Sequence, residues 1–76
     1  MPIAFVLINL EKGSEGEALQ SLNQVREVEE AYSVYGVYDI VAKIYAESMD
    51  ELKDTVTSKI RRLSMVRTTL ALMVIE

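Results

Sequence analysis

Asp39 is the residue whose type and position best fit a chemical role. It stands directly before the apolar run that begins at Ile40 and three residues after Gly36. One interpretation is structural, because an aspartate at a turn often hydrogen-bonds its own backbone. The other is functional, because a carboxylate at the start of a strand can pair with a ligand ammonium group through a charge-assisted hydrogen bond. Thr68 and Thr69 could then supply hydroxyl and backbone donors for a carboxylate of the same ligand.

The four tyrosines surround the same stretch of the chain, at positions 32, 35, 38 and 45. We interpret Tyr32 and Tyr45 as packing residues of neighbouring strands. Tyr35 and Tyr38 flank the turn at Gly36, and we expect these two to line a pocket. The glycine itself is interpreted as a turn residue, since no phosphate-binding glycine-rich loop accompanies it.

Most catalytic chemistry is excluded by composition. The chain has no cysteine and no histidine, which removes thiol catalysis, serine–histidine pairs and the usual zinc ligands. No second acid, base or metal site accompanies Asp39. The sequence therefore predicts no catalytic residue, no metal and no cofactor.

The totals fit one small acidic domain that spans residues 1–76. The formal net charge is −4, whereas nucleic-acid binders usually carry a basic stripe. We interpret the short basic cluster as the end of a helix, where cations suit the helix dipole; it comprises Lys59, Arg61, Arg62 and Arg67. No apolar run reaches the roughly 20 residues of a membrane span. We therefore expect a cytoplasmic protein that contacts neither nucleic acid nor membrane directly.

Hydrophobic periodicity predicts six elements in the order βαββαβ. Each helix is preceded by a Ser-x-x-Glu capping box, at Ser14 and at Ser48. The glutamates at 27, 29 and 30 are interpreted as a solvated edge. The expected strands cover residues 3–10, 28–35, 38–46 and 66–75, and the expected helices cover 15–24 and 49–63.

This order predicts an α+β fold, a ferredoxin-like plait in which both helices cover one face of a four-stranded antiparallel sheet. The first and last strands are nevertheless apolar on both sides. In the last strand Thr68, Leu70 and Leu72 share one side and Thr69, Ala71 and Met73 the other. A bare apolar sheet face marks an interface. We therefore expect a homodimer, a dimeric α+β barrel with its sheets packed face to face.

Two stretches of the chain resemble a known family. Residues 31–41, Ala-Tyr-Ser-Val-Tyr-Gly-Val-Tyr-Asp-Ile-Val, are similar to the Gly-x-Tyr/Phe-Asp hairpin of the RAM domain, the effector-binding half of Lrp/AsnC transcription regulators. Residues 63–69, Leu-Ser-Met-Val-Arg-Thr-Thr, resemble the family's Leu-Pro-x-Val-x-x-Thr approach to the last strand. The first strand already begins at residue 3, so the expectation is a stand-alone RAM protein without a helix-turn-helix domain.

The resemblance implies transcription regulation through amino-acid sensing. Such dimers assemble into octamers or other rings, with the amino acid bound in clefts between dimers. Carried onto this chain, the hairpin around Gly36, Tyr38 and Asp39 forms one wall of the cleft. Asp39 meets the ligand ammonium, and backbone donors near Gly36 meet its carboxylate. The last strand contributes Thr69 and Thr68, and we expect full-length Lrp/AsnC regulators as partners.

The sequence departs from the family at two places, Ser64 for a proline and Ala71 for a second threonine. The missing hydroxyl at Ala71 leaves open a ligand-free oligomerisation or adaptor module. A small dimeric α+β-barrel enzyme is a further alternative, although it would normally need a polar pair among core positions that are aliphatic here. An ACT-type regulatory domain shares the plait, and its glycine-rich first turn is matched only by Gly13 and Gly16.

Overall fold

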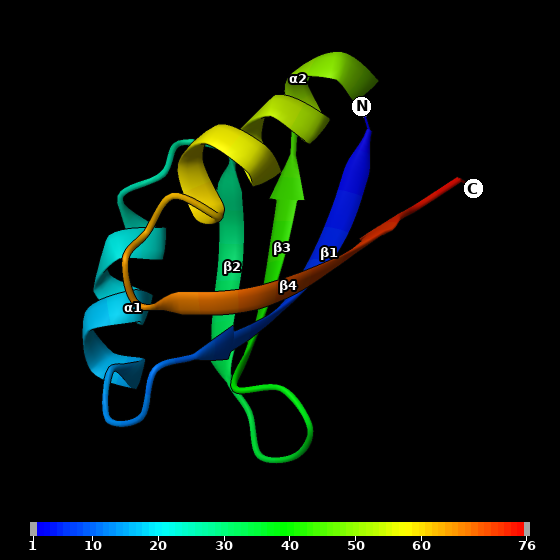
Figure 1. Cartoon of the computed structure of the whole chain (residues 1–76). Helices are drawn as coiled ribbons and strands as arrows, with labels where there is room; N and C mark the ends of the chain where they lie inside the picture. Colours follow the sequence, from blue (N-terminus) through cyan, green and yellow to red (C-terminus); the bar gives the residue numbers. More distant parts are fainter. Residues whose placement is uncertain (1, 76) are drawn as a thin grey trace.

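A computed structural model describes residues 2–75, so the two ends of the predicted domain, Met1 and Glu76, lie outside the described residues. The chain alternates strands and helices in the predicted βαββαβ order (Figure 1). Its elements are β1 (Ile3–Leu10), α1 (Glu15–Asn23), β2 (Val28–Ser33), β3 (Ile40–Tyr45), α2 (Met49–Asp54), a π-helical continuation η1 (Thr55–Ile60) and β4 (Val66–Met73).

The four strands form one antiparallel sheet in the order β2-β3-β1-β4. Both helices lie on the same side of this sheet (Figure 1). This arrangement confirms the ferredoxin-like α+β plait. It places β1 in the middle, where one strand pairs with both β3 and β4.

The core lies between the helices and one face of the sheet. Alternate residues of β1 and β3 point into it, as the period of two requires. Ala4, Val6 and Ile8 pair with residues of β3 and are completely buried. They pack against buried residues of the helices, which include Ala18, Leu22, Leu52, Val56 and Ile60.

The opposite face of the sheet is apolar and uncovered. Phe5 and Leu72 pair across β1 and β4 and remain 38% and 50% exposed. Leu70, Tyr45 and Tyr32 continue this open face across the sheet. The bare apolar face predicted from the sequence is therefore present.

The β2–β3 connection is longer than the tight turn that we expected. Both strands stop short of the predicted bounds, and residues 34–39 form the loop between Ser33 and Ile40. The backbone N–H of Val34 donates to the carbonyl of Asp39 at 2.9 Å, which closes the loop. Gly36 has φ of +152°, in the region that favours glycine.

A bulge in β2 changes which side chains face the core. Val28 pairs with Ile44, whereas Glu30 pairs with Lys43, so the register shifts between them. Val28 therefore packs against the core, while Glu30 accompanies Lys43 on the open face. The strand expected at residues 28–35 therefore does not alternate regularly, and the extra residue of a bulge cannot be read from apolar spacing.

Of the two predicted capping boxes, only the second forms its serine cap bond, and its glutamate accepts from the backbone N–H of Glu47 in place of Ser48. The Ser48 hydroxyl accepts from the backbone N–H of Glu51 at 3.1 Å. The Ser14 hydroxyl instead donates to the Glu11 carbonyl, so it makes no cap bond to α1. The loop after β1 thus competes successfully for the Ser14 side chain.

Glu27 corrects the prediction of a solvated acidic edge. Its side chain is only 5% exposed, and both carboxylate oxygens lie 3.0 Å from Lys59 Nζ. The hydrogen bond from Lys59 holds the pKa of Glu27 below its ordinary value of 4.5, against the opposing effect of burial. Since Glu27 precedes β2 and Lys59 lies in η1, this ion pair joins the second helix to the edge of the sheet.

Replacing Lys59 with methionine should lower the free energy of unfolding by about 1–3 kcal/mol, because a buried carboxylate loses its main partner. Urea unfolding followed by circular dichroism measures this loss. Lys53→Met in α2 is the matched control, since Lys53 is exposed, and it should change stability little. Equal losses in both variants would contradict the importance of the Glu27 ion pair.

The same ion pair predicts the pH dependence of stability. A carboxyl group whose pKa is lowered by folding stabilises the folded state above its unfolded pKa, and this contribution is lost as the pH falls through the folded pKa. Stability should therefore decline below about pH 4.5. The decline should be shallower in Glu27→Gln, whose side chain cannot titrate, when unfolding is measured from pH 7 to pH 3. An identical slope in the two proteins would exclude Glu27 as a source of the decline.

Candidate functional site

Asp39 connects the end of the loop to β1 through two hydrogen bonds. Its backbone N–H donates to the Ile8 carbonyl at 2.9 Å. Its carboxylate oxygen Oδ2 accepts from the backbone N–H of Leu10 at 2.8 Å. The β1–β3 ladder ends at the Ile8–Ile40 pair, so the carboxylate satisfies a backbone N–H of β1 just beyond the end of that ladder.

The Asp39 carboxylate lines a hollow of about 300 Å³ at this end of the sheet, together with Asn9, Leu10, Arg67 and Thr68. Asn9 Nδ2 donates to Thr68 Oγ1 at 3.1 Å, which leaves the Thr68 hydroxyl hydrogen available for another acceptor. The hollow therefore combines a carboxylate, a guanidinium and a hydroxyl. Such a set complements a small molecule that carries both charges.

Thr69 lies on the other side of β4 from Thr68. Thr68 pairs with Asn9 on the open face, and Thr69 pairs with Ile8 on the core face. Arg61 Nε donates to Thr69 Oγ1 at 2.7 Å. Arg61 and Thr69 line a second hollow of about 240 Å³. Val66, Arg67 and Thr68 also line it, and the last two residues line the first hollow as well.

The three loop residues of the predicted site do not line either hollow. Tyr35 is fully exposed, Gly36 is exposed at the same loop, and Tyr38 is partly buried. The structure thus brings Asp39 and Thr68 together and leaves Tyr35, Gly36 and Tyr38 apart from them within one chain. A role of these three residues in ligand binding stays a prediction.

Two residues with polar side chains in the hollow, Asn9 and Arg67, are missing from the predicted site. Asn9 is a polar residue in the otherwise apolar strand Ile3–Leu10, and this exception could have identified it as a candidate site residue from the sequence. The sequence-based interpretation of Arg67 as part of a basic helix end is wrong, because η1 ends at Ile60 and Arg67 is the second residue of β4.

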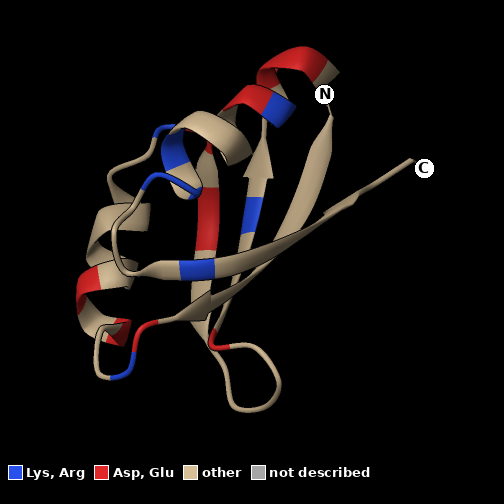
Figure 2. Ribbon diagram, viewed as in Figure 1, with Lys and Arg blue, Asp and Glu red and all other residues tan. Residues whose placement is uncertain are grey.

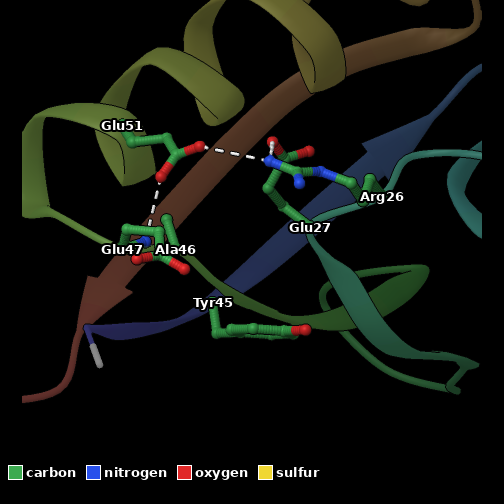
Figure 3. Close-up of a pocket in the computed structure, with 6 residues that line it drawn as sticks. All are labelled: Arg26, Glu27, Tyr45, Ala46, Glu47 and Glu51. Carbon is green, nitrogen blue, oxygen red and sulfur yellow. Dashed lines mark hydrogen bonds and ion pairs between the residues drawn. The ribbon is translucent and has the colours of Figure 1, made fainter.

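A third hollow lies near the beginning of β2 (Figure 3), and the one cationic side chain that lines it, Arg26, is paired within the protein. Arg26 contacts Glu27 at 3.6 Å and Glu51 at 3.4 Å. Glu51 also accepts from the backbone N–H of Glu47 at 2.9 Å. Because these groups already have partners, we assign this hollow a structural role.

Within residues 2–75, no group of three or more acidic, histidine or cysteine side chains is arranged to hold a metal ion. Neither helix in this range is long and apolar enough to cross a membrane.

The family model described as the Lrp/AsnC ligand binding domain matches residues 3–76 of this chain. A search of curated proteins gave no match. Among solved structures, FFRP-DM1 is 35% identical with a TM-score of 0.95, and the alignment covers 99% of this chain and 100% of that one. The protein TTHA0845 from Thermus thermophilus is 34% identical with a TM-score of 0.94, over 100% of this chain and 95% of that one.

The larger AsnC of E. coli is 30% identical with a TM-score of 0.92, and this chain spans 51% of its length. The transcriptional regulator NMB0573 of Neisseria meningitidis, solved as a complex with L-Met, has a TM-score of 0.87. At 17% identity, this last likeness shows the fold alone.

Replacing Asp39 should affect stability in a way that depends on the substituent. Asp39→Ala leaves the Leu10 N–H without its acceptor and should lower the free energy of unfolding by about 1–3 kcal/mol. Asp39→Asn keeps an oxygen acceptor and should cost about 1 kcal/mol or less. Chemical denaturation of both variants measures the difference. Equal losses of stability in the two variants would contradict a stabilising role for the hydrogen bond from the Leu10 N–H to the Asp39 carboxylate.

Proposed function

The chain belongs to the Lrp/AsnC ligand-binding domain family, and from this premise we propose that it is an amino-acid-binding regulatory module and not an enzyme. The observation that carries the proposal is the hollow in which Asp39, Arg67 and Thr68 meet. A free amino acid is a zwitterion, and this lining offers a negative group for its ammonium and positive and hydroxyl donors for its carboxylate.

Asp39 suits the ammonium group because its two carboxylate oxygens are differently engaged. Oδ2 accepts from Leu10, which fixes the orientation of the side chain. Within the described residues, Oδ1 has no protein hydrogen-bond partner and is free to accept. A carboxylate held in place loses little conformational freedom when a ligand binds, which favours affinity.

The open sheet face supports assembly of the module. It presents Phe5, Leu70 and Leu72 to solvent, and a second copy could cover them sheet to sheet. On the β2 side of this face, the Tyr32 hydroxyl donates a hydrogen bond to the Glu30 carboxylate. This hydrogen bond raises the pKa of the Tyr32 hydroxyl. We propose a homodimer built on this face, assembling further into a ring in which ligand clefts form between dimers.

A ligand held between dimers would favour the assembled form by its differential affinity for that state. The likeness to AsnC, and the fold shared with a regulator solved with L-Met, support an amino acid as the effector class. We further propose a cytoplasmic protein that modulates full-length Lrp/AsnC regulators by association, without contacting nucleic acid itself.

A ligand-free oligomerisation module is the second candidate, and two observations at β4 favour it. Thr69 Oγ1 is already engaged by Arg61. Ala71 lies on the core side of β4, where it packs against the core and offers no hydroxyl. An enzyme is less well supported, because the buried polar residues in the range 2–75, Glu27 and Thr55, both make internal hydrogen bonds.

Asp39→Asn should abolish or strongly weaken amino-acid binding while the fold persists, since the neutral amide lacks the charge that pairs with an ammonium. Thermal unfolding of the wild-type protein with each of the twenty amino acids should identify one or a few ligands. At a hundredfold excess over Kd, binding should stabilise the protein by about 2.7 kcal/mol. Wild-type melting unchanged by every amino acid would favour the oligomerisation module.

Leu72→Glu should dissociate the proposed dimer, because it places a charge in the middle of an apolar interface. Mass measured by light scattering over a range of concentrations should fall towards that of one chain. Met49→Glu is the control, since Met49 is 37% exposed at the start of α2 on the helical side. A wild-type monomer at all concentrations, or an unchanged mass in Leu72→Glu, would overturn the sheet-to-sheet dimer.

A further inference from the structure

Half of the basic residues of this acidic chain lie in one short segment. Residues 59–67 contain Lys59, Arg61, Arg62 and Arg67, out of eight Lys and Arg in total. Figure 2 shows them at the end of the second helix, on the loop that leads into β4 and near the start of that strand. Lys59 is engaged with Glu27, whereas Arg61 and Arg67 line the two hollows at the beginning of β4.

The two hollows adjoin each other, because Arg67 and Thr68 line both. Their charges differ. The first contains the Asp39 carboxylate beside Arg67. The second contains Arg61 and Arg67, and no acidic side chain of the described residues lines it. Together they offer one negative group and two positive groups around the beginning of β4, which is an edge strand of the sheet.

Both guanidinium groups keep donors for a ligand. Arg61 uses Nε for Thr69, and no protein partner within residues 2–75 engages its two terminal nitrogens. Arg67 pairs with Glu11 at 3.9 Å, and both side chains are about 65% exposed. An exposed ion pair of this length contributes little stability, so a ligand carboxylate can replace Glu11 at small cost. A guanidinium matches a carboxylate with two parallel hydrogen bonds.

Building on the proposed function, we propose that the effector is an acidic amino acid, glutamate or aspartate. Its ammonium pairs with Asp39, one carboxylate pairs with Arg67, and the second carboxylate is directed to Arg61. A basic amino acid would bring its side-chain cation to two guanidiniums and be rejected. A dicarboxylate without an ammonium would leave Asp39 unpaired and bind more weakly.

Calorimetric titration tests this preference with L-glutamate, L-aspartate, L-glutamine, L-lysine and glutarate. Wild-type protein should bind L-glutamate or L-aspartate at least about tenfold more tightly than L-glutamine, glutarate or L-lysine. Arg67→Ala should lower affinity for the acidic ligand roughly 10- to 100-fold. Arg61→Ala should remove most of the preference over L-glutamine. Arg62→Ala is the matched control, because Arg62 lines neither hollow, and it should leave the preference intact.

Glu11→Gln provides a variant expected to improve binding. Removing the carboxylate that faces Arg67 frees the guanidinium, so affinity for the acidic ligand should rise severalfold. Glu17→Gln, an exposed residue of α1, is the matched control for the change in net charge and should have a smaller effect. Equal effects of the two changes would overturn the competition at Arg67.

The outcomes separate this inference from the proposed function. L-Glutamine or an apolar amino acid binding as tightly as L-glutamate, with binding lost in Asp39→Asn, would overturn the acidic effector and leave amino-acid sensing standing. Glutarate binding as tightly as L-glutamate would overturn the pairing of this ligand with Asp39. No binding by any amino acid would overturn both proposals.

Discussion

The central position of β1 is the constraint on which the rest of the structure depends. One strand must pair with β3 on one side and β4 on the other, and it must present apolar side chains to both faces. Its buried residues hold the helices, while Phe5 belongs to the open face. Its last residues, Asn9 and Leu10, meet the Asp39 carboxylate and Thr68. The core, the proposed interface and the proposed ligand site therefore share a single eight-residue strand.

The fold was largely predictable because its signals are local. A period of two in apolar residues defines each strand, and the order of strands and helices leaves few topologies. The errors arose where groups outside the local pattern decide the outcome. Glu27 is polar by type, yet Lys59, 32 residues later, makes its burial possible. Ser14 has the sequence of a capping box, but the Glu11 carbonyl takes its hydroxyl. Neither the alternation of a strand nor the spacing of a capping box indicates that Glu27 will pair with Lys59 or that Ser14 will bond the Glu11 carbonyl.

The candidate site shows the same division between local and distant information. The Gly-x-Tyr-Asp motif pointed to Asp39, and the structure gives this residue a structural role that differs from the expected turn bond, because its carboxylate accepts from Leu10 on another strand. Thr68 and Thr69 are neighbours in sequence, but alternation in β4 sends them to opposite faces. Arg67 and Asn9 join Asp39 only because β1 lies between β3 and β4.

The position of the hollow also suggests how binding could influence assembly. Asp39 precedes β3, Asn9 lies near the end of β1 and Arg67 near the start of β4, so a ligand that pairs with Asp39 and Arg67 would connect the starts of β3 and β4 across the end of β1. The same strands carry the open face. A bound ligand would restrict their relative movement and would cost less in an assembly that has already ordered them. Ligand binding and association would then favour each other by the same coupling free energy, since linkage is reciprocal.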